Sequence, residues 1–318
     1  MDSTIKIIRN SIHTFLQHYT FFTSTSLLSL PFSLSILLSF SFLPNHSLSL
    51  HSHLQSLFDA AGFPPESDFF SILNLKLSQT ITSSILILPF TLSFLLLTKS
   101  FIIQSFNTLV KPPPSLTGIF NSILHTQIWN TLLIISANAT CFWVLFIAFN
   151  CLQNLNIPSL FITFFGGIAY SIVIANTLII CNMALILSGM ELSGGFISIL
   201  KSCVMIRGRT SVALSLSLPV NIALAGIEFL FQFRVVKAYS DFGSNKITST
   251  MVLEGLFIAY MYSILITIDV IIGCVFFKSC KIAYDQNIVD QEAGRTKEEL
   301  QEEINGFTLV KCLEKDFS

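Results

Sequence analysis

Two carboxylates lie inside long apolar stretches, and these are the residues best placed to do chemistry. Glu228 and Asp269 each interrupt a stretch that is otherwise free of charge. An ionisable side chain within a membrane span is costly, so it marks a proton relay, a substrate path or an internal charge partner. At about 1.5 Å per helical residue, Asn138, Asn176 and Asn221 are expected near the membrane level of Asp269. Two interpretations stay open: a polar pathway at mid-membrane, or interhelical hydrogen bonds worth about 0.6–2 kcal/mol each.

The composition indicates that membrane spans position these residues. The chain has 318 residues, of which 52% are hydrophobic and 11% charged, whereas soluble domains carry about 25% charged residues. Its mean hydropathy is +0.73. A net charge of −1 provides no basic surface, so no nucleic-acid partner is expected. The seven cysteines show no metal-ligand spacing, and no nucleotide-binding or hydrolase motif occurs. We therefore expect no metal, no cofactor and no catalytic residue.

Six apolar stretches are long enough to cross a bilayer, which takes about 20 helical residues. We therefore expect an all-α, polytopic transmembrane helical bundle between a polar segment, 1–18, and an acidic tail, 278–318. The expected spans cover about 19–43, 81–98, 128–150, 159–187, 212–233 and 252–277.

The stretches that flank and join these spans carry weaker signals. The first span is Ser-rich and is broken by Pro31; a signal peptide or a transit peptide is the alternative to a retained span. A long loop is expected over 44–80, with a short helix that ends at Gly62 and a second helix capped by Ser67. An amphipathic piece is expected over 116–126, before the third span. In the tail, Thr296 and Glu299 form a capping box, which predicts a short helix there that a partner protein could bind.

The distribution of Lys and Arg predicts the orientation, because cytoplasmic loops carry an excess of these cations. With a cytoplasmic N-terminus, nine cations near the spans fall on the cytoplasmic side and four on the other. Both termini are therefore expected in the cytoplasm. The nine are Lys6, Arg9, Lys99, Lys111, Lys201, Arg207, Arg209, Lys278 and Lys281.

Residues 190–237 form the segment around which the spans are expected to be arranged. A short amphipathic helix with a basic end leads into the span that carries Pro219. Lys201, Arg207 and Arg209 are expected at the cytoplasmic surface, where anionic headgroups attract each cation by about 1 kcal/mol. A plain positive-inside anchor and specific lipid recognition both remain open.

Small residues recur at every fourth position on the last two expected spans. Such stripes let helix backbones approach closely, so we expect these spans to form an antiparallel hairpin. The stripes are Ala213, Ser217, Asn221 and Ala225 on one span, and Gly255, Ala259, Ser263 and Thr267 on the other.

Two resemblances accompany these patterns. The run MELSGGFISILKSCVMIRGRTSVALSLSLPVNIALAGIEFLFQFRVV, with LFDAAGFPPESDFFSILNLKLSQTI upstream, resembles a plant family of uncharacterised multispan membrane proteins over about residues 50–285. The pattern of Lys201-Ser202 and then Ile206-Arg207-Gly208-Arg209 before a span is similar to the membrane domain attached to some bacterial glycerophosphodiester phosphodiesterases. The catalytic part of those enzymes has no counterpart here, so the second resemblance implies no activity.

The sequence favours a non-enzymatic protein of the plasma membrane or an endomembrane that organises lipid or partner proteins. Its expected partners are the bilayer, anionic headgroups, and a second copy or another protein bound through the tail. The alternative is a small-solute or lipid transporter that uses the mid-membrane polar residues. A membrane-embedded lipid-modifying enzyme is the second alternative.

Overall fold

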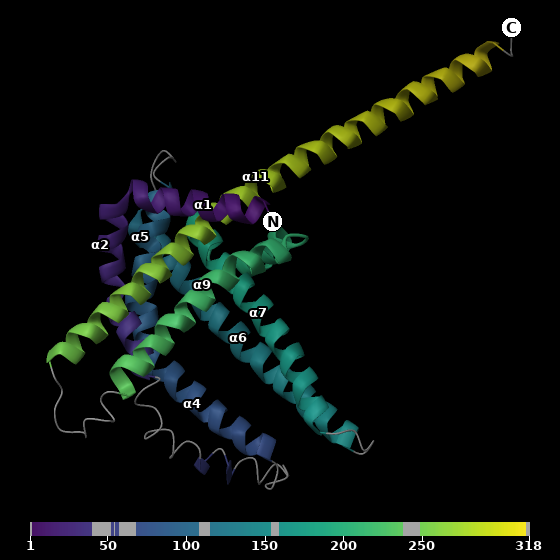
Figure 1. Cartoon of the computed structure of the whole chain (residues 1–318). Coiled ribbons are helices and arrows are strands. Elements are labelled where there is room, and N and C mark those ends of the chain that lie inside the picture. Colours follow the sequence, from purple (N-terminus) through teal and green to yellow (C-terminus); the bar gives the residue numbers. More distant parts are fainter. Residues whose placement is uncertain are drawn as a thin grey trace. The chain divides into compact units, whose positions relative to one another are not determined.

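The computed structural model is built from helices (Figure 1). It describes residues 2–39, 52–53, 55–56, 68–107, 115–153, 159–237 and 249–315, and these contain no strand. The prediction of an all-α fold is therefore confirmed for this part of the chain. Two compact units are formed, Met1–Val275 and Phe276–Ser318.

The helices follow one another with few breaks. In chain order they are α1 (Asp2–Gln17), α2 (Tyr19–Leu28), Leu30–Ser39, α4 (Asp68–Phe90), the π-helical turn η1 (Thr91–Leu95), α5 (Leu96–Asn107), α6 (Leu116–Gln153), α7 (Ser159–Glu191), α8 (Phe196–Ile206), α9 (Thr210–Phe231), the π-helical turn η2 (Gln232–Val236) and α11 (Ser249–Lys315).

Five helical stretches in the described residues are long and apolar enough to cross a membrane. They are Ile81–Asn107, Leu116–Leu145, Phe164–Glu191, Thr210–Val236 and Ser249–Tyr284. The pair formed by α2 and Leu30–Ser39, bent by 48°, is a sixth candidate if it is taken as one broken span.

The bend in this pair lies at Ser29, two residues before Pro31. Proline has no N–H to donate to the Leu27 carbonyl, and its ring clashes with that carbonyl in a continuous helix. The hydroxyl of Ser29 is hydrogen-bonded to the hydroxyl of Ser263 on α11, and Ser263 also donates to the Ser26 carbonyl. The bend is therefore held against the last candidate span by buried serines.

Helices continue through three positions where the sequence suggested that an element begins or ends, because a fall in hydropathy does not end a helix. The helix expected after Ser67 does begin at Asp68, but it continues without a break into Ile81–Asn107, since no Gly or Pro occurs over 68–80. The amphipathic piece over 116–126 is the first part of α6. Helix α11 passes through Thr296 without interruption, so this residue caps no helix. The part of the first span beyond residue 39 lies outside the described residues.

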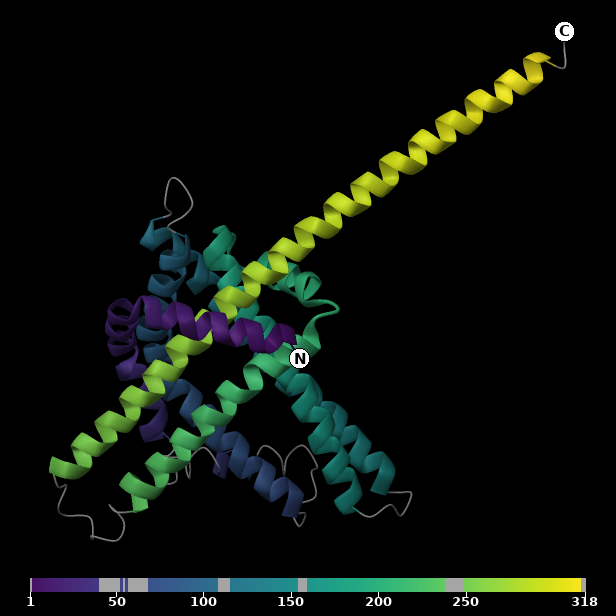
Figure 2. The same cartoon turned by 45° about the horizontal axis from the view of Figure 1, so that its top comes forward.

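Helices α6 and α7 lie side by side and antiparallel (Figures 1 and 2), and polar side chains join them. The three α6 residues involved are eight positions apart and recur along one seam. Ser122 donates to the Ser188 carbonyl (2.9 Å), Asn130 to the Cys181 carbonyl (2.9 Å), and Tyr170 to Asn138 Oδ1 (2.6 Å). These bonds link the two helices along the seam.

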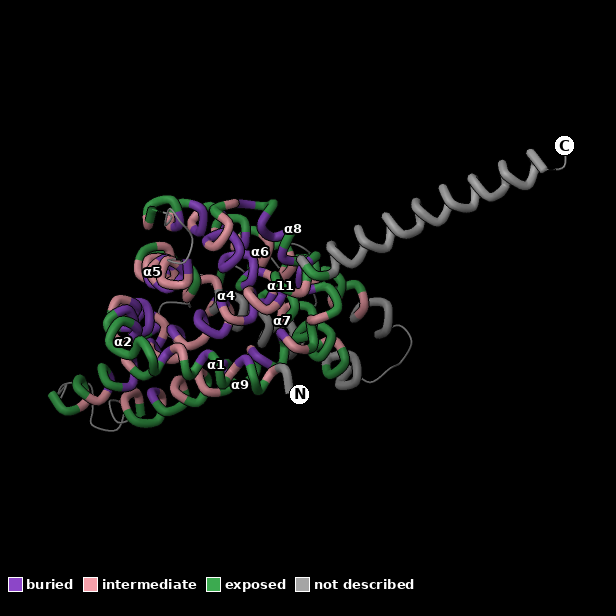
Figure 3. The backbone as a smooth tube through the Cα atoms, turned by 90° about the horizontal axis from the view of Figure 1, so that it is seen from above, coloured by how far each residue is buried: buried purple, intermediate pink, exposed green. Residues whose placement is uncertain are grey.

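A hydrophobic core joins the bent N-terminal pair to α9 and α11. Its buried residues are Phe32, Leu37, Phe231, Ile258, Ala259, Tyr262 and Ile266. Seen from above, the buried stretches of the chain lie where the helices meet, and exposed residues line their outer faces (Figure 3). The N-terminal helices are therefore part of the packed unit.

Candidate functional site

The most constrained local structure is the elbow, residues 191–209, which turns the chain from α7 through α8 into α9. Leu192, Gly195 and Gly208 have φ angles of 55°, 88° and 83°, a left-handed region that favours glycine. The Gly195 N–H donates to the Thr126 hydroxyl of α6 at 2.9 Å. The turn is thus fastened to the helix that it crosses.

Two of the three glycines of the elbow, Gly194 and Gly195, lie directly on α6. A Cβ added to Gly194 would lie 3.0 Å from the Ser122 carbonyl oxygen, and one added to Gly195 would lie 2.7 Å from the His125 ring. Contacts of this length require a neighbour to move. The pair is therefore glycine because α6 leaves no room for a side chain.

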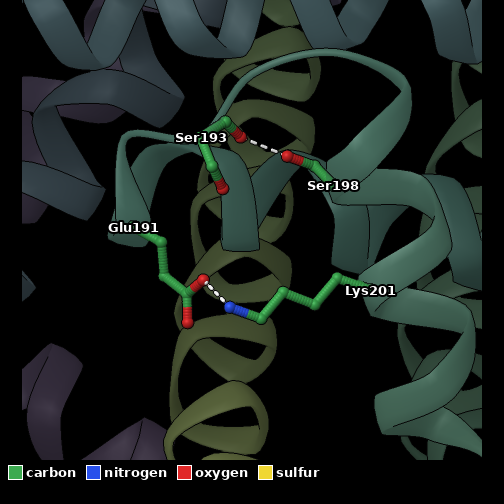
Figure 4. Close-up of polar contacts among 4 residues, drawn as sticks. All are labelled: Glu191, Ser193, Ser198 and Lys201. Atoms are coloured by element: carbon green, nitrogen blue, oxygen red, sulfur yellow. Dashed lines mark hydrogen bonds and ion pairs between the residues drawn. The ribbon is translucent and has the colours of Figure 1, made fainter.

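Polar contacts tie α8 back to the end of α7 (Figure 4). Lys201 forms an ion pair with Glu191, and the Ser198 hydroxyl donates to the Ser193 carbonyl. On the other side of the turn, the ring of Phe196 lies 5.8 Å from that of Trp129, centroid to centroid. These contacts hold α8 in a fixed orientation against the end of α7 and against α6.

Helix α8 divides into sectors when its residues are placed at 3.6 per turn. One sector is buried against the protein, a second is apolar and exposed, and Lys201 lies between them. The buried sector is Ser198, Ile199, Ser202, Met205 and Ile206, and the exposed apolar sector is Phe196, Ile197, Leu200 and Val204. Ile197 is 69% exposed and Val204 61%. Arg207 and Arg209 follow directly at the helix end.

Cys203 lies on the exposed side of α8. Its partial burial raises the pKa of the thiol above the ordinary value. The described residues contain no group of three or more His, Cys, Asp or Glu side chains that could hold a metal ion. The elbow is therefore a surface of apolar and cationic groups.

A second polar feature lies inside two candidate spans. Lys99 of α5 and Asp269 of α11 interact electrostatically, although no hydrogen bond joins them. Both side chains are half-buried, and both positions lie within stretches apolar enough to cross a membrane. A cation and an anion thus lower each other's cost of residing there.

The other polar residues singled out in the sequence do not form one cluster with Asp269. Glu228 accepts a hydrogen bond from the Tyr262 hydroxyl at 2.9 Å, and Asn138 belongs to the seam between α6 and α7. Asn176 and Asn221 are exposed. The structure therefore distributes these groups over separate helix contacts.

The small-residue stripes also divide between different neighbours. On α11, Ser263 faces the N-terminal pair, and Gly255 lies against Phe231 of α9, at 3.6 Å from the position of an added Cβ. On α9, Ala213 is buried and Ser217 half-buried, but Asn221 and Ala225 are exposed. The buried face of α9 is instead formed by Ala213, Leu216, Val220 and Phe231.

Contacts that α9 and the following turn η2 make with the start of α11 run in opposite chain directions. Glu228 meets Tyr262, and Arg234 pairs with Glu254 at 2.7 Å. These two helices are antiparallel. Buried Ala259 belongs to the core shared with the bent pair, which explains its small side chain.

The sequence predicts that Lys99 lies in a loop on the cytoplasmic side. The loop position is wrong, because Lys99 lies within helix α5. Hydropathy ends the span at this first cation, yet the residues that follow, Phe101, Ile102 and Ile103, are apolar and continue the helix. That continuation, together with the lone carboxylate Asp269, is a signal from which an internal partner could have been inferred.

Replacing Gly195 by Ala is expected to destabilise the folded protein more than the same change at Gly208. Both positions carry the strain of a positive φ, about 1–2 kcal/mol for Ala, but only Gly195 also meets a ring. Gly226, which is helical with nothing within 4 Å of an added Cβ, is the matched control, and Ala there should be neutral or stabilising. Unfolding followed in mixed micelles gives the three values; equal losses at positions 195 and 226 would contradict the close contact.

Lys99 and Asp269 are expected to show a coupling energy in a double-mutant cycle. Lys99→Leu or Asp269→Leu alone leaves an unpaired charge within a span and should cost about 3 kcal/mol. The double variant should cost less than the two losses added together. Arg234→Gln with Glu254→Gln, an exposed pair worth less than about 1 kcal/mol, is the control; additive losses at 99 and 269 would show that the two charges do not interact.

Comparison with known proteins gives one family. The family model described as "Domain of unknown function (DUF8558)" matches residues 3–308. This range includes nearly all of α1, the elbow, and the two candidate spans that carry Lys99 and Asp269. A search of curated proteins finds no match, and a search of solved structures finds none either. The chain belongs to the family described as "Domain of unknown function (DUF8558)".

Proposed function

We propose that this chain is an integral membrane protein that binds anionic lipid headgroups at its elbow and organises lipid or partner proteins around it, without catalysing a reaction. The observation that carries the proposal is the division of α8 into a protein-facing sector and an exposed apolar sector, with cations beside them. A helix of this kind lies in the interface plane, with its apolar face in the acyl boundary and its cations among the headgroups.

The proposed topology has six spans, with the bent N-terminal pair as the first, and both termini in the cytoplasm. Counting only the cations that lie outside the candidate spans leaves six on the cytoplasmic side against three on the other. The excess of Lys and Arg therefore remains on the cytoplasmic side. It puts the elbow and its three cations on the cytoplasmic leaflet, where anionic lipids of the plasma membrane or an endomembrane are concentrated.

Arg207 and Arg209 carry more of the proposed lipid attraction than Lys201. Lys201 is paired with Glu191, so part of its charge is already neutralised. Neither arginine has an acidic partner among the contacts found in the described residues, and Arg207 is exposed. Guanidinium groups also bind phosphate through two parallel hydrogen bonds.

The double variant Arg207→Gln with Arg209→Gln is expected to lose preference for anionic lipid. At about 1 kcal/mol per cation, the preference for phosphatidylserine over phosphatidylcholine should fall about thirtyfold. Spin-labelled lipids competing for the reconstituted protein measure this ratio. Lys237→Gln, an exposed cation at the opposite end of the fifth candidate span, is the control; a loss of equal size there, or none at the arginines, rejects the elbow as the lipid site.

A second candidate function is transport of a small solute or lipid, and the Lys99–Asp269 pair is the observation that favours it. Charges within spans line substrate or proton paths in many transporters. Purified protein in liposomes should then move solute, and Asp269→Asn should abolish the flux while the protein stays folded. Glu254→Gln is the control. Flux that survives Asp269→Asn removes this candidate and leaves the pair as a structural contact.

A further inference from the structure

Helix α1 divides into the same kind of sectors as α8. Placed at 3.6 residues per turn, its residues form a buried sector, an exposed apolar sector and an exposed polar sector. In order around the helix these are Ile7, Ser11 and Phe15, then Ile12, Ile5 and Leu16, then Arg9, His13 and Lys6. Ile5 is 64% exposed and Leu16 63%.

Contacts near both ends of α1 attach it to the rest of the protein. The Thr4 hydroxyl is hydrogen-bonded to the Ser215 hydroxyl of α9 at 3.2 Å, and the Phe15 ring stacks on Phe22 of α2 at 5.9 Å between centroids. Figures 1 and 2 show α1 lying across the N-terminal part of α9. Its direction is therefore set by the protein and not by the helix alone.

The contact with Ser215 also sets how deep α1 lies. Ser215 is five residues beyond the start of α9 at Thr210, which corresponds to about 7.5 Å along the helix axis. Helices that lie in a membrane interface are buried by about 5–10 Å. With the start of α9 at the membrane surface, the exposed apolar sector of α1 lies at the level of the first acyl carbons.

We propose that α1 is an in-plane membrane helix whose occupant is an anionic lipid surface. Ile5, Ile12 and Leu16 insert among the acyl chains, while Lys6 and Arg9 bind headgroup phosphates from the water side. The charge fits this occupant, because the two cations outnumber Asp2, the one acid of the helix. The proposal adds a second lipid-binding element to the elbow, and it rests on the proposed membrane location.

Tryptophan probes in the full-length protein, reconstituted in vesicles, test this placement. Trp129 and Trp143 are first replaced by Phe, and a single Trp is then introduced at Ile12 on the apolar sector or at Asn10 on the polar side. Brominated lipid should quench Ile12→Trp strongly and Asn10→Trp weakly, and aqueous iodide should do the reverse. Leu16→Trp with His13→Trp repeats the comparison at a second pair of positions, in case one variant fails to fold.

The charge is tested with Lys6→Gln and Arg9→Gln in the Ile12→Trp protein. In vesicles that contain brominated phosphatidylserine, each change should lower the ratio of membrane-docked to undocked α1 by about fivefold. In purely zwitterionic vesicles the changes should have no effect. An effect of equal size in both vesicle types would overturn the proposed recognition of anionic lipid.

The failure of this inference is distinguishable from the failure of the proposed function. In the unmodified protein, Trp129 and Trp143 lie on candidate spans and are 41% and 56% exposed, so brominated lipid quenches them if the spans are in the bilayer. Quenching of these two without quenching of Ile12→Trp overturns the role of α1 alone. Absence of quenching at all of these positions overturns the membrane location itself.

Discussion

The structure depends on one constraint: a polar group within an apolar helix bundle must find its partner in the protein. A bilayer core offers no water to accept or donate a hydrogen bond. Ser29 at the bend is hydrogen-bonded to Ser263, the Gly195 N–H in the turn donates to Thr126, and the Lys99 cation interacts electrostatically with Asp269. At these three places, a side chain from a distant part of the sequence supplies the partner.

The same constraint explains why α9 is central to the arrangement. Its N-terminal end receives α8 through the elbow and α1 through the Ser215 contact, and its C-terminal half meets α11 at Glu228 and Arg234. The short helices α1 and α8 are thus attached at the same end of α9, which with η2 is long enough to cross a membrane.

Properties that depend on neighbouring residues could be predicted from the sequence, and those that depend on distant residues could not. The all-α fold follows from hydropathy, and the bend of the first pair follows from Pro31. The sequence shows that Asp269 is a costly carboxylate in an apolar stretch. Its partner Lys99 lies far away in the chain and ends an apolar run, which predicts a loop position. The sectors of α1 were present in the spacing of Ile5, Ile12 and Leu16, but an average over residues 1–18 reads as polar.

The separation of Lys99 and Asp269 along the chain has a consequence for how the protein is synthesised. Ribosomes add roughly 5–20 residues per second, so residue 269 leaves the ribosome about ten to thirty seconds after residue 99. During that interval the nascent chain carries a cation in an apolar helix whose counter-charge has not yet been made. If Ile81–Asn107 and Ser249–Tyr284 both cross a membrane, the first of them holds an unpaired Lys99 until translation has reached the second, and the long side chain of Lys99 would then have to reach the headgroups.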